Sequence, residues 1–304
     1  MKSLLKNLRH RAHLAKISLM GTLYARNPRK RAEQLFLKDL GRPINWEHPT
    51  HFVEKLRWIQ FHTDPTLRTR LADKLAAREY VAGKGLSSIL IPLHGVWDSP
   101  SEIDFSRLPD KVVLKSTHGS GDAVIVTDSA IANTARIVRH FRQVLARPFG
   151  WYFAETHYNS ITPRLLAEAL LPNDAAFSRS IVDYKFYCCN GEPLLCMVCS
   201  DRKDIAAHDK ACTIYDTAWL HHPEWLADGH KTSSVPIPEP SSLQEMLSIC
   251  RLLTEGIPFV RLDLYESGGK PYFGEFTFSP DAYHPAILSE KAFGMLSNRL
   301  TLPV

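Results

Sequence analysis

Two strand-like runs near the end of the chain constrain the fold more than any other feature. Residues 259–265 and 272–277 alternate apolar and polar side chains on either side of a glycine-containing turn, which is the pattern of a β-hairpin. The alternation predicts that Asp263 and Glu275 lie on facing strands and that Arg261 shares a strand face with Asp263. Carboxylates on neighbouring strands can hold Mg²⁺ beside a phosphate, and a nearby Arg can stabilise charge on a transferred group. An ordinary cross-strand ion pair is the alternative for these residues.

A second pair of strands is predicted around a glycine loop. Residues 111–115 and 123–127 are apolar runs, and the loop 116–122 between them reads STHGSGD. Such a loop presents several backbone N–H groups to one point, which suits a phosphate, and Lys115 adds a positive charge beside it. The element after the loop is a strand, which excludes a P-loop and a dinucleotide fingerprint. A plain hairpin turn is the alternative, but the later carboxylate hairpin favours a nucleotide site.

Taken in order, these stretches resemble the ATP-grasp fold. The motifs that carry the likeness are DK at 73–74, VLK at 113–115, LLAEALL at 165–171, RLD at 261–263 and EFT at 275–277. The chain is most similar to the TupA-like ATP-grasp proteins of teichuronopeptide and capsular-polysaccharide synthesis, over about residues 45–295. That closer likeness rests on residues 52–58, 91–93, 183–186 and 275–278. The resemblance implies an α+β class, with two lobes that hold ATP between them behind a helical N-terminal segment.

The resemblance also implies a role for each site residue. The ATP-binding residues would be Lys74, Lys115, Gly119, Ser120, Gly121, Glu168, Ala169, Leu170, Leu171 and Lys185. Within this set Lys74 and Lys115 would hold the phosphates and Gly119 to Gly121 would cap them. Glu168 with the backbone after it would form the adenine hinge between the lobes. The Mg²⁺ ligands would be Asp263, Glu275 and Thr277, and the catalytic residues would be Arg261 and Lys115.

The chain departs from the family pattern at the substrate end of the site. Many ATP-grasp ligases have Asn two residues after the metal-binding Glu, where this chain has Thr277. A hydroxyl can still meet Mg²⁺ directly or through water. The glycine that often follows the next proline is also absent, because Pro280 is followed by Asp281. We therefore expect a substrate site unlike that of the better-known ligases.

Charge is distributed unevenly along the chain. The net charge is +5, but residues 1–31 hold nine basic residues and no acidic one, so the remainder carries 28 basic against 32 acidic residues. Apolar residues recur at helical spacing in this segment, which predicts a helix with one apolar stripe and a basic flank. Such a helix would contact an anionic membrane surface or pack on the protein's own body. Nucleic acid is not an expected partner, because the rest of the chain is slightly acidic and has no recognised binding module.

The cysteines do not have the spacing of a metal site. Asn190 and Gly191 mark a hairpin turn, so Cys196 and Cys199 fall in a strand and point to opposite faces. We expect small buried thiols in a reduced cytoplasm. No apolar run approaches the roughly 18 residues that a membrane-spanning helix needs. We therefore predict a cytoplasmic protein, with residues 1–31 as the segment that would place it at the inner face of the membrane.

Apolar periodicity and turn residues predict the remaining elements. Helices are expected over residues 31–40, 52–61, 66–81, 130–146 and 242–255, and further strands over 89–93, 164–171 and 212–219. Gly41 and Gly83 are expected to end helices, and Ser242 with Glu245 to form a capping box. The predicted division is a basic helical extension (1–44), a region before the ATP site (45–110), a nucleotide lobe (111–171) and a C-terminal lobe with the metal hairpin (172–304).

The function implied is that of an ATP- and Mg²⁺-dependent ligase. ATP would phosphorylate a small carboxylate, an amino acid or a uronic acid, and an amine acceptor on a saccharide would attack the acyl phosphate to form an amide. Phosphoryl transfer to a sugar hydroxyl is one alternative, since it would use the same groups. A glycosyltransferase is another, although the chain has no Asp-x-Asp pair. A non-catalytic nucleotide-binding scaffold is the last, and the lysines and carboxylates argue against it.

Overall fold

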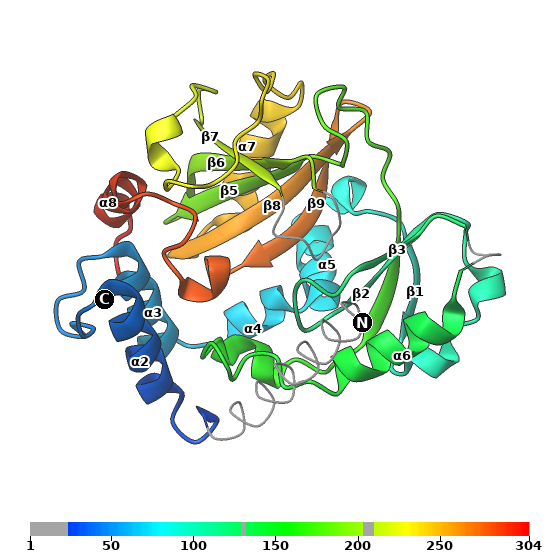
Figure 1. Cartoon of the computed structure of the whole chain (residues 1–304), viewed down its shortest axis with the longest axis horizontal. Helices are drawn as coiled ribbons and strands as arrows, with labels where there is room; N and C mark the ends of the chain where they lie inside the picture. The colour runs from blue at the N-terminus through cyan, green and yellow to red at the C-terminus, as the bar shows by residue number, and fades with distance from the viewer. Residues whose placement is uncertain (1–23, 129–131, 203–209, 304) are drawn as a thin grey trace, which may run out of the picture.

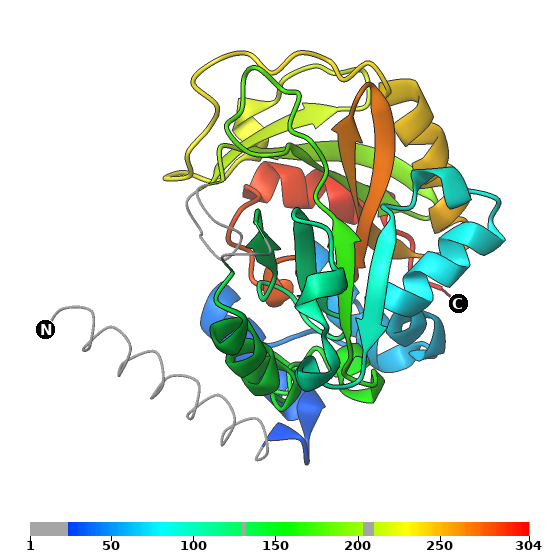
Figure 2. The same ribbon diagram turned by 90° about the vertical axis from the view of Figure 1, so that its right-hand side faces the viewer.

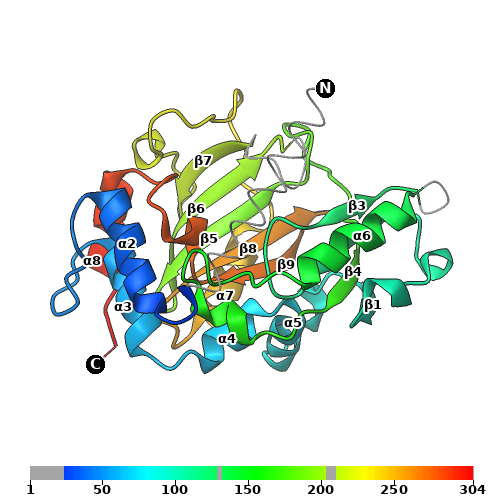
Figure 3. The same ribbon diagram turned by 60° about the horizontal axis from the view of Figure 1, so that its bottom comes forward.

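The structure is a computed structural model that describes residues 24–128, 132–202 and 210–303. These residues form helices and two antiparallel sheets, so the α+β class is confirmed. In Figures 1 and 3, helices α4 and α5 lie between the larger and the smaller sheet. The expected basic helix falls mainly in residues 1–23, outside the described residues. Among the described residues, none of the helices has the length and apolar character needed to cross a membrane.

The smaller sheet contains the strands on either side of the glycine loop. Its order is β1-β4-β2-β3, and the strands are β1 (Leu93–Trp97), β2 (Val112–Ser116), β3 (Val124–Val126) and β4 (Leu165–Ala169). Helix α6 (Thr134–Leu145) covers one face (Figure 2) and buries Ile137, Phe141 and Val144, which recur at helical spacing. Strand β1 pairs with β4, so this sheet combines residues from the predicted 45–110 and 111–171 regions.

The strand expected at 89–93 is wrong in position. Residues Ser87–Ile89 form a 3₁₀-helix, and β1 begins only at Leu93. Pro92 has no N–H to donate to a strand ladder, so the chain joins the sheet after it. The Pro92 carbonyl instead accepts a hydrogen bond from the Ala169 backbone at 2.9 Å.

The larger sheet contains the two predicted hairpins. Its order is β7-β6-β5-β8-β9, and the strands are β5 (Asp183–Cys189), β6 (Glu192–Ser200), β7 (Ala211–Asp216), β8 (Phe259–Ser267) and β9 (Lys270–Thr277). The described cysteines are buried and free. Cys196 lies in the core on one face of this sheet and Cys199 in the core on the other, as the alternation predicted.

Helices cover both faces of the larger sheet. One core includes residues of α4 (Thr66–Ala72), α5 (Lys74–Gly83) and α7 (Leu243–Thr254), and the other includes residues of α2 (Pro28–Leu40), α3 (Phe52–His62) and α8 (Glu290–Arg299). Gly41 ends α2 with a left-handed φ of 68°, as expected. Helix α8 was not predicted. The other 3₁₀-helices are η2 (Pro100–Glu102), η3 (Phe105–Arg107), η4 (Thr156–Ser160), η5 (Pro223–Trp225) and η6 (Pro280–Tyr283).

Two expectations about helix ends are wrong. The single helix expected over 66–81 is divided at Asp73, which has an extended ψ of 113° and accepts a hydrogen bond from the Leu75 N–H as the N-cap of α5. The second part, helix α5, ends at Gly83, as expected. Ser242 makes no capping hydrogen bond, because its hydroxyl donates to Glu266 on β8. The break at Asp73 places Lys74 in the first turn of α5.

Candidate active site

The larger sheet carries the two carboxylates of the hairpin pattern. Asp263 on β8 lies opposite Glu275 on β9, so their expected placement on facing strands is confirmed. The register shifts beside Asp263, where Gly274 faces the Asp263 backbone. A Cβ at Gly274 would lie 2.8 Å from the Asp263 carbonyl oxygen, which is closer than van der Waals contact. Glycine therefore permits the bulge that sets the two carboxylates beside each other.

Arg261 connects the polar groups on this face of the hairpin. Its guanidinium donates to both oxygens of Asp263, from Nε at 2.7 Å and from Nη2 at 2.8 Å. Nη2 also donates to the Thr277 hydroxyl at 3.0 Å and lies 3.8 Å from Glu275. Such a two-bond pairing fixes the orientation of Arg261 as well as its charge. Asp263, Glu275 and Arg261 are therefore brought together, as the alternation predicted, and Thr277 lies with them.

A buried row of alternating charges extends from Asp263 onto β5. The Lys185 ammonium contacts Asp263 and lies 2.7 Å from Asp183, which pairs with Arg202 at 2.9 Å. Burial alone would raise the pKa of Asp183, but Lys185 and Arg202 lower it to about 2. Burial raises the pKa of Asp263, and Arg261 and Lys185 oppose that rise. Both Asp263 oxygens thus already have cationic partners.

Glu275 differs from Asp263 in having room for a new partner. Its side chain is 31% exposed, and its ion-pair distances are long, 3.9 Å to Lys74 and 3.8 Å to Arg261. Enclosure would raise the pKa of Glu275, but Lys74, Lys185 and Arg261 lower it overall. Glu275 is therefore an anion with oxygens available to a cation. Among the described residues, no three His, Cys, Asp or Glu side chains converge. The carboxylate oxygens of Glu275 and Asp263 are of the donor type that Mg²⁺ takes together with phosphate and water oxygens.

The glycine loop lies next to this hairpin through Lys74. The Lys74 ammonium donates to the Gly119 carbonyl and lies 3.9 Å from Glu275, while its backbone N–H donates to the Thr117 carbonyl at 3.1 Å. Gly121 has a φ of 74°, which residues with a side chain adopt rarely. The structure thus joins two stretches that are about 150 residues apart in the sequence.

Glu168 forms the centre of a second ionic group. It accepts from Lys115 at 2.7 Å through one oxygen and from Arg78 at 2.8 Å through the other. Arg78 was not predicted, although it lies four residues after Lys74 on α5 and therefore on the same helix face. The backbone N–H of Ala169 donates to Pro92, and that of Leu170 reaches the Lys111 carbonyl at 3.5 Å. The hinge role of Glu168 and the residues to Leu171 stays a prediction.

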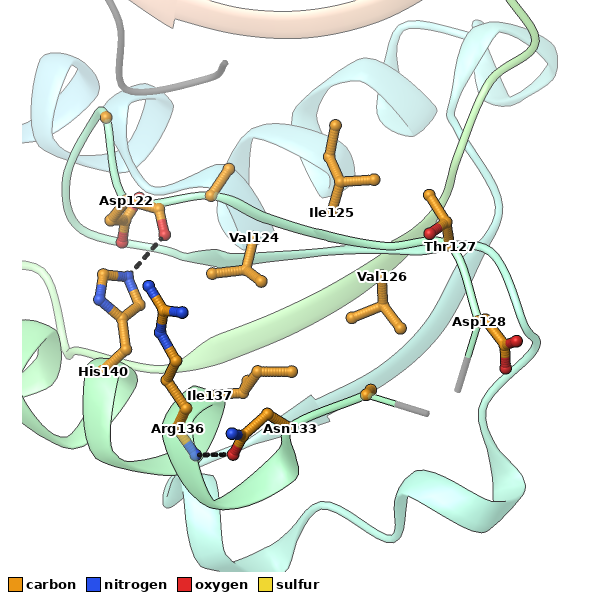
Figure 4. Close-up of a pocket in the computed structure, with 13 residues that line it drawn as sticks. Asp122, Val124, Ile125, Val126, Thr127, Asp128, Asn133, Arg136, Ile137 and His140 are labelled. Carbon is orange, nitrogen blue, oxygen red and sulfur yellow. Dashed lines mark hydrogen bonds between the residues drawn. The ribbon is translucent and has the colours of Figure 1, made fainter. Parts of the chain in front are cut away.

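A cavity of about 450 Å³ lies between β3 and α6, and Gly121 of the glycine loop is among the residues that line it. In Figure 4, Val124 and Val126 point toward α6 and Ile125 points away from it. Side chains alternate along a strand, and the residues of β2 and β4 in the α6 core are Val112, Leu114, Leu165 and Ala167. Lys115 and Glu168 therefore belong to the opposite face of the sheet. This cavity is not the space beside the ionic groups described above.

Comparison with known proteins identifies the fold. The profile of the family described as TupA-like ATPgrasp matches residues 54–297. No curated protein matches the chain. Similar solved structures include D-alanine–D-alanine ligase from Bacillus anthracis complexed with ATP, at 12% identity and a TM-score of 0.37, covering 69% of this chain and 54% of that one.

Two further solved structures have a similar degree of likeness. A RimK domain ATP-grasp protein from Sphaerobacter thermophilus has 14% identity and a TM-score of 0.41, covering 78% of this chain and 69% of that one. L-amino acid ligase from Bacillus licheniformis has 13% identity and a TM-score of 0.38, covering 68% and 40%. The chain thus spans about half the length of the two ligases. The match over residues 54–297 includes both sheets and every described residue of the two ionic groups, and the chain belongs to the TupA-like ATP-grasp family.

Proposed function

We propose that the protein is an ATP- and Mg²⁺-dependent ligase that joins a carboxylate to an amine through an acyl phosphate. The observation that carries this proposal is the position of Lys74, which contacts Gly119 of the glycine loop and lies 3.9 Å from Glu275. A loop suited to phosphate and a carboxylate suited to a cation meet at that point, and ATP-dependent group transfer needs both. Membership of the ATP-grasp family supports the same reading.

In the first half-reaction a substrate carboxylate oxygen attacks the γ-phosphorus of ATP. The new O–P bond gives an acyl phosphate, and the bond to the β-phosphate oxygen breaks with its electron pair on ADP. Lys74, Lys115 and Lys185 would hold the phosphates, and Arg261 would face the transferred group. Mg²⁺, when bound at Glu275 and Asp263, would neutralise phosphate charge. Thr277, whose hydroxyl accepts from Arg261 at 3.0 Å, would complete that position directly or through water.

In the second half-reaction an amine nitrogen attacks the acyl carbon. The C–N bond forms, and the C–O bond to phosphate breaks with its electron pair on inorganic phosphate. We propose an amino acid or a uronic acid as the carboxylate and an amine on a saccharide as the acceptor, following the biosynthetic setting of the family that the motifs resemble. Phosphoryl transfer to a sugar hydroxyl remains the second candidate, because Thr277 stands where many ATP-grasp ligases have Asn.

A product analysis distinguishes these candidates. The full chain is incubated with ATP, Mg²⁺ and one of L-alanine, L-glutamate or D-glucuronate, with or without D-glucosamine, and products are identified by mass spectrometry. Amide together with ADP supports the ligase. A phosphorylated sugar supports the kinase. Transfer from a nucleotide sugar to D-glucosamine in a parallel incubation without ATP supports a glycosyltransferase. Absence of ADP release with every acid contradicts both ATP-dependent readings.

Membrane contact through residues 1–31 is a separate proposal, supported by their nine basic residues. The described end of this segment packs on the protein's own body. Arg29 stacks over Trp46 at 4.2 Å, and Arg31 stacks over Tyr152 at 5.1 Å and donates to the Tyr152 carbonyl at 2.9 Å. These contacts favour the packed alternative for residues 24–31. A truncation that keeps them intact is therefore the sharper test of lipid binding.

A further inference from the structure

A buried carboxyl group lies beside the end of β9, the strand that carries Glu275 and Thr277. Glu155, in the segment before η4, is only 5% exposed. Its carboxylate accepts a hydrogen bond from the Ser279 hydroxyl at 2.6 Å. Among the described residues, the carboxylate has no ion-pair partner within 4.0 Å. Burying an ionised carboxyl group without a counter-ion costs free energy, so the neutral form of this group is favoured.

Ser279 connects this carboxyl to the candidate active site. Glu275 and Thr277 lie on one face of β9, which ends at Thr277, and Ser279 follows two residues later. Phe276 and Phe278 both lie in the core on the other face, which fits this alternation. Ser279 has a φ of −128° and a ψ of 66°, so the backbone leaves the strand conformation here, and its side chain is buried. The hydroxyl that contacts Glu155 therefore lies two residues beyond Thr277, at the end of the strand that carries the predicted metal ligands.

The negative charges of Glu155 and Glu275 both act on the hydroxyl of Tyr158. Burial raises the pKa of Tyr158 well above its usual value, and both carboxylates add to the rise. The charged and titratable groups that face Glu155 are Tyr158 from η4, Arg57 from α3 and Tyr283 from η6. Arg57 is directed elsewhere, because it donates to the carbonyls of residues 153 and 154 at 3.1 Å. The positive charge of Arg57 lowers the pKa of Glu155, but Arg57 forms no ion pair with that carboxylate.

Burial has the largest effect on the pKa of Glu155. It raises the pKa of Glu155 to about 7, although Ser279 and Arg57 lower it. A carboxyl with this pKa can accept and release a proton near neutrality, as general acid–base chemistry requires.

We propose that Glu155 accepts, through the Ser279 hydroxyl, the proton that the amine loses when it attacks the acyl phosphate. As the C–N bond forms and phosphate leaves, an N–H proton passes to the Ser279 oxygen and the Ser279 proton passes to Glu155. The nitrogen thereby loses its positive charge, and the Glu155 carboxylate loses its negative charge. Ser279 is the residue that touches the substrate, and Glu155 acts through it. This inference rests on the proposed ligase function.

Hydroxylamine separates the relay from the earlier chemistry. It is uncharged at neutral pH and attacks acyl phosphates without a proton acceptor, so hydroxamate formation reports the first half-reaction. We compare hydroxamate with amide formation from D-glucosamine for the wild type, Glu155→Gln, Ser279→Ala, Ser279→Thr and Ser297→Ala. Ser297 is the matched control, because it is a buried serine on α8 whose hydroxyl donates to a backbone carbonyl.

The relay predicts a specific pattern. Glu155→Gln and Ser279→Ala should lower kcat for amide formation by about 100-fold or more, the usual contribution of a positioned proton acceptor, and should leave hydroxamate formation unchanged. Ser279→Thr keeps the hydroxyl and should restore most of the rate, and Ser297→Ala should alter neither reaction. Wild-type amide formation should decline below about pH 7 as Glu155 is protonated, and Glu155→Gln should lose this inflection.

Three results would overturn the proposal. Equal loss of both half-reactions in Glu155→Gln and Ser279→Ala would mean that these residues only support the fold. Normal amide formation in both variants would mean that the proton leaves by another route. If the wild type forms no hydroxamate with any of the three acids, the ligase function itself fails, and the relay fails with it.

Discussion

Exchanging Asp263 and Glu275 for their amides, one at a time, separates a structural role from a cation-binding role. Asp263 is 1% exposed and contacts both Arg261 and Lys185. Asp263→Asn removes the charge between these two buried cations, which should destabilise the fold by about 3–5 kcal/mol, as when one partner leaves a buried ion pair. Glu275 is 31% exposed with long ion-pair distances, so Glu275→Gln should cost about 1 kcal/mol or less.

The measurement is thermal unfolding without Mg²⁺ or nucleotide, so that loss of a ligand cannot contribute. A cost of about 3 kcal/mol should lower the melting temperature of Asp263→Asn by roughly 6–12 °C, while Glu275→Gln melts close to the wild type. ADP release should fall by about 100-fold or more in both variants. Equal melting temperatures would refute the account of the buried charges. Near-normal turnover of Glu275→Gln at saturating Mg²⁺ would refute its assignment as a metal ligand.

Other predictions test the remaining parts of the site. Lys115→Ala should weaken ATP binding by about 2 kcal/mol, the scale of a charge-assisted hydrogen bond, and an unchanged Kd in calorimetry would exclude Lys115 as a phosphate ligand. Gly121→Val should also weaken ATP binding, since its φ is 74°, whereas Gly121→Asn, which tolerates that conformation, should bind more tightly than Val. Because the pKa of Glu155 is raised in the folded protein, protonated Glu155 contributes stability that is complete below the pKa of Glu155 in the unfolded chain and is lost as pH rises through about 7. Urea unfolding between pH 5 and 8 should show this loss in the wild type and not in Glu155→Gln. Deleting residues 2–23 should release the protein from anionic vesicles if that segment binds lipid, and full-length protein that does not co-sediment with them would end the membrane proposal.

The hairpins could be predicted because their signals are local. Alternation and a turn residue decide which residues of β8 and β9 share a face, and the observed register agrees. The same reasoning separated Cys196 from Cys199, which lie in different cores. Where a signal depended on a distant partner, the prediction failed. Ser242 has the sequence of a cap but donates to Glu266, which is 24 residues away in the chain.

The break between α4 and α5 has the same kind of cause. Residues 66–81 have a continuous helical pattern, and a helix through Asp73 satisfies local propensity. In the fold the Lys74 N–H donates to the Thr117 carbonyl instead, and Asp73 caps the second helix. No sequence pattern within the helix specifies that contact. It also explains why Arg78 was missed, since its partner Glu168 is 90 residues away.

The ionic groups of the site suggest how it would accept Mg²⁺ and ATP together. Each lysine proposed to hold a phosphate already faces a carboxylate: Lys74 with Glu275, Lys115 with Glu168, and Lys185 with Asp263. If a polyphosphate bound alone, the lysines would move to it and leave their carboxylates unpaired. If a cation bound alone, the carboxylates would move to it and leave the lysines unpaired. Either case leaves unpaired charge in an enclosed site, which costs free energy. Binding both lets the lysines move to phosphate as carboxylates move to the cation, so that charge stays balanced. The affinity for ATP should therefore depend strongly on Mg²⁺, and this coupling should be weaker in Glu275→Gln.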